Sequence, residues 1–257
     1  MLPISSRRRV ELIPAEYDVA QAETALAKAH EQLAALPPVP DAPSPEDPSE
    51  SAPDDDARKT AETALRTARA TVKLIETTLE HRRLAVAALA AKGQLPPVYV
   101  LRVPTPEQRA RWRKAIMETA GPYPADVALA DALEAALVAM QPENLDALQA
   151  DVVAWREAPD GVLEPALVER INKAVDIAAR HDPAVRSILA QRQFWLETQQ
   201  LEAARSVLIG CEHGPKITLL FDRVSDAGLM DVPDDHQAQI GRKAVELLTL
   251  SPALAKN

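Results

Sequence analysis

The sequence predicts an all-α protein: an N-terminal antiparallel helical hairpin patterned as a coiled coil, then a multi-helix bundle with at most one short extended segment. Three observations carry this prediction. Apolar residues make up 47% of the chain but aromatic residues only 3%, because Ala, Leu and Val supply most of the apolar content. Apolar residues recur every three or four positions over long stretches, the spacing of one helix face. Seven glycines in 257 residues are few for a protein built on turns or phosphate-binding loops.

The composition narrows the class of protein. A net charge of −9 argues against a general nucleic-acid binder, which presents a basic face. A single cysteine excludes an internal disulfide and fits a reducing compartment. No apolar run approaches the ~18 residues of a membrane span, so no membrane partner is expected. The start "MLPISSRRRVELIP" lacks the apolar stretch of a secretory signal. We therefore expect a soluble cytoplasmic protein.

Two domains are predicted, residues 1–97 and 98–257. Within the first, residues 37–56 contain seven prolines, seven acidic residues and no basic residue. Such a segment cannot bury apolar surface, and its prolines oppose helix formation, so it is predicted to be a disordered linker.

Heptad spacing on both sides of this linker predicts two helices, about residues 15–36 and 57–92, that lie antiparallel. The second helix is the longer, so part of its seam needs another partner inside or outside the chain, and a homo-oligomer is one such assembly. The second helix is also basic. Its charge either forms a solvated face or attracts the acidic linker, which would then compete with an acidic partner. The predicted seam residues are Val19, Ala22, Leu26, Ala29, Leu33 and Leu36, then Leu65, Ala68, Val72, Ile75, Leu79, Arg82, Val86 and Leu89.

The second domain begins with "VYVLRV", residues 98–103, which predicts a short strand or extended segment. A helix start follows: Thr105 is placed to cap it, Pro106 suits the first helical position, and Gln108 completes a capping box. Trp112 and Ile116 share one stripe of this helix, which indicates core packing. Further helices are predicted at about 125–140, 143–157, 163–180, 184–210 and 234–249.

No catalytic residue, cofactor or metal site is predicted. Cys211, Glu212 and His213 stand together, but catalysis by a Cys–His pair needs both side chains within hydrogen-bond reach and an oriented base behind them. The five histidines are scattered without the spacing of a metal site. No glycine-rich phosphate-binding motif occurs.

The predicted helix at 184–210 is apolar on two sides. Trp195 belongs to a broad stripe, and a second, nearly opposite stripe contains residues seven apart. Either the helix is sandwiched within a bundle, or the second stripe is a groove wall that receives a partner's apolar segment. On the second interpretation, the partner-binding residues are Phe194, Leu201, Ala204 and Leu208.

Four segments carry a family resemblance: "VYVLRVPTPEQRARWRKAI", "YPADVALADAL", "RQFWLETQQLEAARSVLIGCE" and the ending "SPALAKN". Together they resemble the tail assembly chaperones of long-tailed bacteriophages. The resemblance covers residues 98–257, so residues 1–92 would be an extension. Cys211 stands in "LIGCE" where the family usually has an aromatic residue.

The resemblance implies a non-enzymatic factor of the host cytoplasm that binds and solubilises the tape measure protein while the tail tube assembles. Such chaperones are often made in two lengths by ribosomal frameshifting, and the longer form is expected to recruit tail tube protein. The ending Ala255-Lys256-Asn257 can be encoded by GCA AAA AAC, which contains a slippery run. The alternative function is a structural virion or adaptor protein that assembles through its N-terminal coiled coil.

Overall fold

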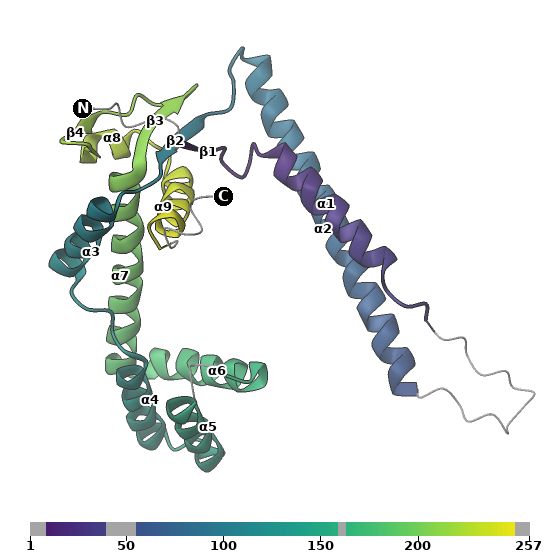
Figure 1. Cartoon of the computed structure of the whole chain (residues 1–257). Coiled ribbons are helices and arrows are strands. Elements are labelled where there is room, and N and C mark those ends of the chain that lie inside the picture. The colour runs from purple at the N-terminus through teal and green to yellow at the C-terminus, as the bar shows by residue number, and fades with distance from the viewer. Residues whose placement is uncertain (1–8, 40–54, 159–162, 250–257) are drawn as a thin grey trace, which may run out of the picture. The chain divides into compact units, whose positions relative to one another are not determined.

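The computed structural model describes residues 9–39, 55–158 and 163–249, most of which are helical (Figure 1). Most of the predicted linker and the terminal Ala-Lys-Asn therefore lie outside the described residues. Contacts divide the chain into two compact units. The first contains the chain up to Leu101 together with Ile209–Thr218; the second contains Arg102–Leu208 and the chain from Leu219 onward. It was not predicted that residues 209–218 belong to the first unit.

The first unit contains two helices that pack side by side, α1 (Val19–Ala34) and α2 (Asp55–Ala91) (Figure 1). Asp18 caps α1 by accepting a hydrogen bond from the backbone N–H of Gln21 at 2.9 Å. Arg82 Nη1 of α2 donates to the carbonyl oxygen of the same Asp18 at 2.6 Å. The beginning of α1 therefore lies beside the C-terminal third of α2.

Each residue at the predicted heptad positions is buried or half-buried. Ala22 and Ala29 of α1 and Val72 and Leu79 of α2 are buried, and the other heptad positions are half-buried. With 37 residues against 16, α2 is roughly 55 Å long and α1 roughly 24 Å. A large part of α2 therefore extends beyond α1.

The structure contains more strands than the single extended segment predicted. Among the described residues are a three-stranded sheet of order β1-β2-β3 and a two-stranded ribbon of β4 and β5. Only β2 coincides with a predicted extended segment. The others are two to five residues long, too short for an alternating pattern, and the sheet pairs segments far apart in sequence, which local periodicity cannot reveal. The strands are β1 (Arg9–Leu12), β2 (Val98–Arg102), β3 (Leu208–Glu212), β4 (Leu219–Leu220) and β5 (Arg223–Val224).

The second unit is mainly helical, and its long helices lie within about one turn of the predicted positions. The capping box before α3 is present: Thr105 Oγ1 accepts from the Gln108 backbone, and Gln108 Oε1 accepts from the Thr105 backbone. The short α8 was not predicted. The helices are α3 (Pro106–Ala120), α4 (Asp126–Met140), α5 (Leu145–Glu157), α6 (Pro165–His181), α7 (Pro183–Val207), α8 (Asp226–Met230) and α9 (Asp234–Thr249).

Helix α7 joins the two ends of this unit. Its N-terminal half packs on α4 and α6, where Val185 enters a core with Leu133, Val152 and Ile171. Its C-terminal half packs on α3, α9 and β5. The unit thus has an α4–α6 bundle at one end of α7 and a layer of α3, α9 and the β4–β5 ribbon at the other (Figure 1).

Gly241 allows α9 to approach α7 closely, which makes Gly241→Ala a test of this packing. A Cβ atom at position 241 would lie 2.8 Å from Gln200 Cβ and 3.1 Å from the Gln200 carbonyl oxygen. Glycine to alanine within a helix normally stabilises by about 1 kcal/mol. Here we expect the free energy of unfolding to fall by about 1–3 kcal/mol, because overpacking outweighs that gain.

Urea denaturation followed by circular dichroism measures this effect. Gly210→Ala is the control, since nothing lies within 4 Å of a Cβ atom at that position. A Gly241→Ala protein as stable as the unmodified chain, or more stable, would refute the close approach of α9 to α7.

Candidate functional site

The segment Arg192–Trp195 of α7 is held to the connection between α3 and α4 on one side only. Trp195 Nε1 donates to the carbonyl oxygen of Gly121 at 3.1 Å, and its ring meets Tyr123 edge-on at 5.1 Å between centroids. The Arg192 guanidinium lies 5.2 Å over the same Tyr123 ring. Phe194 takes no part in these contacts, and it is 50% exposed.

The structure divides the predicted binding stripe on α7. Phe194 and Leu201 are 50% and 38% exposed, whereas Ala204 is 2% and Leu208 0% exposed. Leu208 belongs to β3, because the helix predicted to reach residue 210 ends at Val207. Ala204 and Leu208 therefore cannot present their side chains to a partner in this conformation. The exposed pair, Phe194 and Leu201, lies two turns apart on one face, here named the α7 face. Partner binding there stays a prediction.

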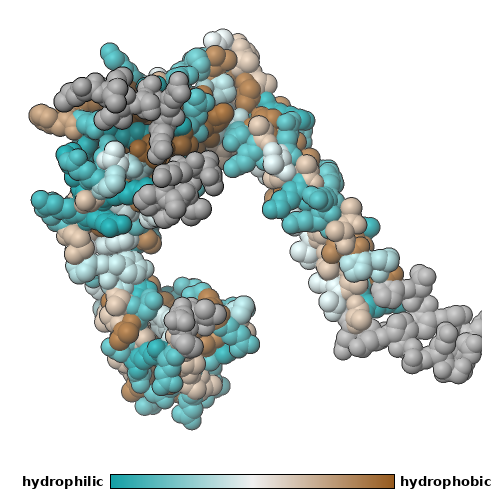
Figure 2. Space-filling view, viewed as in Figure 1, coloured by the Kyte–Doolittle hydropathy of each residue, from teal (hydrophilic) through white to brown (hydrophobic). Residues whose placement is uncertain are grey.

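A second apolar surface is a cleft of about 1100 Å³ between α4, α5 and α6, here named the α4–α6 cleft. In Figure 2, hydrophobic residues lie among hydrophilic ones on the surface of this bundle. The cleft was not predicted, because it depends on how three helices splay apart and not on the pattern of any one of them. Its apolar lining includes Leu137, Met140, Leu148, Ala174 and Ile177.

The rim of the α4–α6 cleft carries more positive than negative charge. Arg170 donates two hydrogen bonds of 2.8 Å to Asp151, from Nε and Nη2, which hold the pKa of that carboxyl below its usual range. Lys173 and His181 also line the cleft. No ion pair or hydrogen bond joins the side chain of Lys173 to another described residue. Because Asp151 is already paired, the rim offers Lys173 as a cation for a partner's acidic group.

A third apolar surface is the turn of the β4–β5 ribbon, here named the apolar turn: Leu219, Leu220 and Phe221. Leu220 pairs with Arg223, so Phe221 and Asp222 are the only residues in the loop. Phe221 is 98% exposed. In Figure 2 apolar side chains protrude where Figure 1 labels β4.

Polar contacts hold the apolar turn in place from α3 and the segment before it. Arg102 Nη1 donates to Asp222 Oδ1 at 2.5 Å, and its Nη2 donates to the Asp222 carbonyl oxygen at 3.2 Å. Gln108 Nε2 donates to Asp222 Oδ2 at 3.3 Å. The hydrogen bond from Arg102, assisted by its charge and by Gln108, holds the pKa of Asp222 below its usual range. Phe221 is thus an exposed side chain on an anchored backbone.

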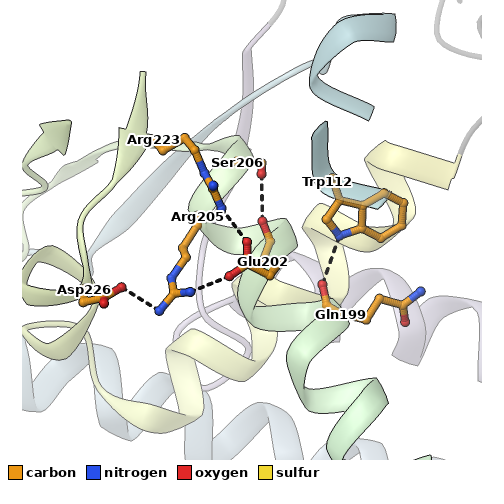
Figure 3. Close-up of polar contacts among 7 residues, drawn as sticks. All are labelled: Trp112, Gln199, Glu202, Arg205, Ser206, Arg223 and Asp226. Atoms are coloured by element: carbon orange, nitrogen blue, oxygen red, sulfur yellow. Dashed lines mark hydrogen bonds and ion pairs between the residues drawn. The ribbon is translucent and has the colours of Figure 1, made fainter. Parts of the chain in front are cut away.

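A buried carboxylate holds the same ribbon to α7 (Figure 3). One oxygen of Glu202 accepts from Arg205, one turn further along α7, and the other accepts from Arg223 of β5. Arg205 also pairs with Asp226 at the start of α8, at 2.6 Å. Burying a carboxylate is costly unless it is paired, and here both oxygens have cationic donors. Glu202 therefore fixes β5 and α8 to α7.

Cys211 and His213 do not form a catalytic pair in this structure. Cys211 Sγ interacts with backbone groups: it donates to the carbonyl oxygen of Glu212 at 3.5 Å and accepts a hydrogen bond from Val98. His213 lies after β3 with positive φ, and it is exposed. Burial raises the pKa of the Cys211 thiol to about 11, which is the opposite of what a thiolate nucleophile requires.

Alkylation by iodoacetamide tests this environment. A pKa near 11 in place of 9.0 lowers the thiolate fraction at pH 8 by about two orders of magnitude, so native Cys211 should react about 100-fold more slowly than Cys211 of the urea-denatured chain. Its rate should still rise about tenfold per pH unit up to pH 10. A native rate that levels off near neutral pH would show an activated thiolate and refute this environment.

Among the residues that the structure describes, no group of three or more His, Cys, Asp or Glu residues could hold a metal ion. None of the helices in residues 9–39, 55–158 and 163–249 is long and apolar enough to cross a membrane. Comparison of the chain with protein-family models, curated proteins and solved structures finds no match.

Proposed function

We propose that this protein is a non-enzymatic tail assembly chaperone that binds the phage tape measure protein and keeps it soluble in the host cytoplasm. The supporting observation is the α7 face. Helix α7 packs on α3, α4, α6, α9 and β5, yet Phe194 and Leu201 stay exposed two turns apart. A helix with that many neighbours has no structural need for an exposed phenylalanine.

Two apolar residues seven apart suit a helical client. An amphipathic helix can lay its apolar stripe along such a face, with apolar anchors recurring every three or four positions. The tape measure protein, long and helical in the family that the sequence resembles, offers many such stripes. The net charge of −9 keeps the chaperone dispersed while it covers apolar surface.

We assign α1 and α2 to a coiled-coil hairpin that extends this chaperone. The same assignment favours the second candidate function, a structural virion or adaptor protein. Helix α2 is longer than α1, and its Leu74 and Leu84 are exposed, so a coiled-coil partner could bind to the face of α2 that carries them. A longer frameshifted form, if it is made, would bring tail tube protein into the same complex.

Co-expression with the tape measure protein tests the proposal. The tape measure protein should be insoluble alone, soluble with this chain, and purified together with it. The chain should be found in lysates of infected cells and be missing from purified particles. A tape measure protein that remains insoluble would refute the chaperone, and recovery of the chain from particles would favour the structural candidate.

A further inference from the structure

We propose that this protein associates head to tail, with Phe221 of one copy inserted into the α4–α6 cleft of the next. The proposal goes beyond the chaperone function, because neither surface includes the α7 face. It rests on three features of the second unit: the conformation of the apolar turn, the lining and charge of the cleft, and their separation along α7.

The apolar turn holds a residue that its backbone does not favour. Phe221 and Asp222 have φ values of 47° and 66°, as two-residue hairpin loops require. Asn and Gly suit such positions, whereas a bulky side chain with positive φ is strained. Phe221 gains no compensating packing, since it is 98% exposed. The fold of the ribbon therefore gives no reason for a phenylalanine here, and contact with another surface does.

The α4–α6 cleft matches this turn in shape and charge. Its volume of about 1100 Å³ is several times that of a phenylalanine side chain, so it can also receive Leu220. The segment that follows the turn, residues 222–235, carries five aspartates and one arginine. Asp222 and Asp226 already pair with Arg102 and Arg205, so Asp231, Asp234 and Asp235 supply the negative charge that remains. The cleft rim presents Lys173 and His181 beside the Arg170–Asp151 pair. An acidic segment with an apolar tip thus faces an apolar cleft with a basic rim, which is the complementarity that selects partners.

The two surfaces cannot meet within one molecule. Val185, near the start of α7, packs in the core of the α4–α6 bundle, while Glu202 holds β5 near its end. The 17 residue steps from Val185 to Glu202 span roughly 26 Å of continuous helix. Insertion must therefore occur between copies. The apolar turn and the α4–α6 cleft are different surfaces, so a dimer still has one free turn and one free cleft. Each copy can therefore bind one neighbour through its turn and another through its cleft.

Sedimentation velocity of the full chain at increasing concentration tests the proposal. The unmodified protein should form dimers and then longer species. Phe221→Asn removes the apolar tip and relaxes the strained turn, so its melting temperature should be equal or higher while self-association weakens at least about tenfold. Ile177→Glu, at an exposed position of the cleft, should weaken association similarly without unfolding α6.

Mixing the two variants is the decisive measurement. Phe221→Asn retains an intact cleft and Ile177→Glu an intact turn, so an equimolar mixture should form a 1:1 dimer that grows no further. Met117→Asn and Val168→Glu, at exposed positions outside both surfaces, are the matched controls and should associate like the unmodified chain.

Several results would overturn the proposal: an unmodified chain that stays monomeric, association that neither variant weakens, or a mixture that stays monomeric. Binding of a synthetic acidic amphipathic helix in the cleft of a monomeric chain would assign the cleft to a different partner. Loss of assembly in these variants with retained tape measure binding would leave the chaperone function intact, so the two proposals fail separately.

Discussion

Trp112→Ala is expected to lower the free energy of unfolding by about 3–5 kcal/mol, as truncation of a large core side chain does. Trp112 of α3 is buried, and its Nε1 donates to the carbonyl oxygen of Gln199 at 3.2 Å (Figure 3). The substitution would leave a cavity between α3 and α7 and would remove this hydrogen bond. Urea denaturation followed by far-ultraviolet circular dichroism measures the loss.

Trp112→Phe is the milder substitution. It removes the N–H donor and part of the indole ring but leaves a smaller cavity than alanine does, so we expect a loss of about 1–2 kcal/mol. Met117→Ala on the same helix, at an exposed position, should change stability little. A loss below about 1 kcal/mol for Trp112→Ala would show that α3 does not pack on α7 as described.

Glu202→Ala is expected to destabilise the second unit by about 2–3 kcal/mol. Removing one partner of a buried ion pair costs about 3–5 kcal/mol. The loss here should be smaller because Arg223 is 41% exposed and water can solvate it once it is unpaired. Glu202→Gln keeps the size and shape of the side chain but removes its charge and one of its two acceptor oxygens, so it tests the loss of these polar interactions without a cavity.

A double substitution supplies the control for this cluster. Arg223→Ala alone should cost less than Glu202→Ala, since it leaves Glu202 paired with Arg205. If the three side chains act together, the double variant Glu202→Ala, Arg223→Ala should be less destabilised than the sum of the two single variants. Strict additivity would mean that Glu202 and Arg223 do not interact.

The helices could be predicted from sequence because their apolar residues recur at helical spacing over three or more turns and their ends carry local signals. Thr105, Pro106 and Gln108 are such a signal, and the capping box they predict is present. The end of α7 carries none: Val207 and Leu208 are both apolar, and the change to strand depends on pairing within a sheet whose other strands are distant in sequence. Strand β3 was therefore not predicted.

The candidate site could be predicted in part. Periodicity placed Phe194 and Leu201 on one face, and both are exposed. The same periodicity included Ala204 and Leu208, whose burial depends on contacts that no local pattern contains. The apolar turn was not predicted, because Phe221-Asp222 lacks the glycine or asparagine that usually marks a two-residue loop. The sequence features that could have indicated this turn are Leu219 and Leu220 before the loop and the five aspartates within residues 222–235.

Equilibrium binding of a soluble tape measure fragment is the most direct test of client binding by the α7 face. Phe194→Ala with Leu201→Ala should weaken binding at least about tenfold, as loss of apolar anchors does, with an unchanged melting temperature. Met117→Ala, an exposed apolar residue on α3, should bind like the unmodified chain. A double variant that binds the fragment as tightly as the unmodified chain, or a fragment that binds neither protein, would contradict the proposed function.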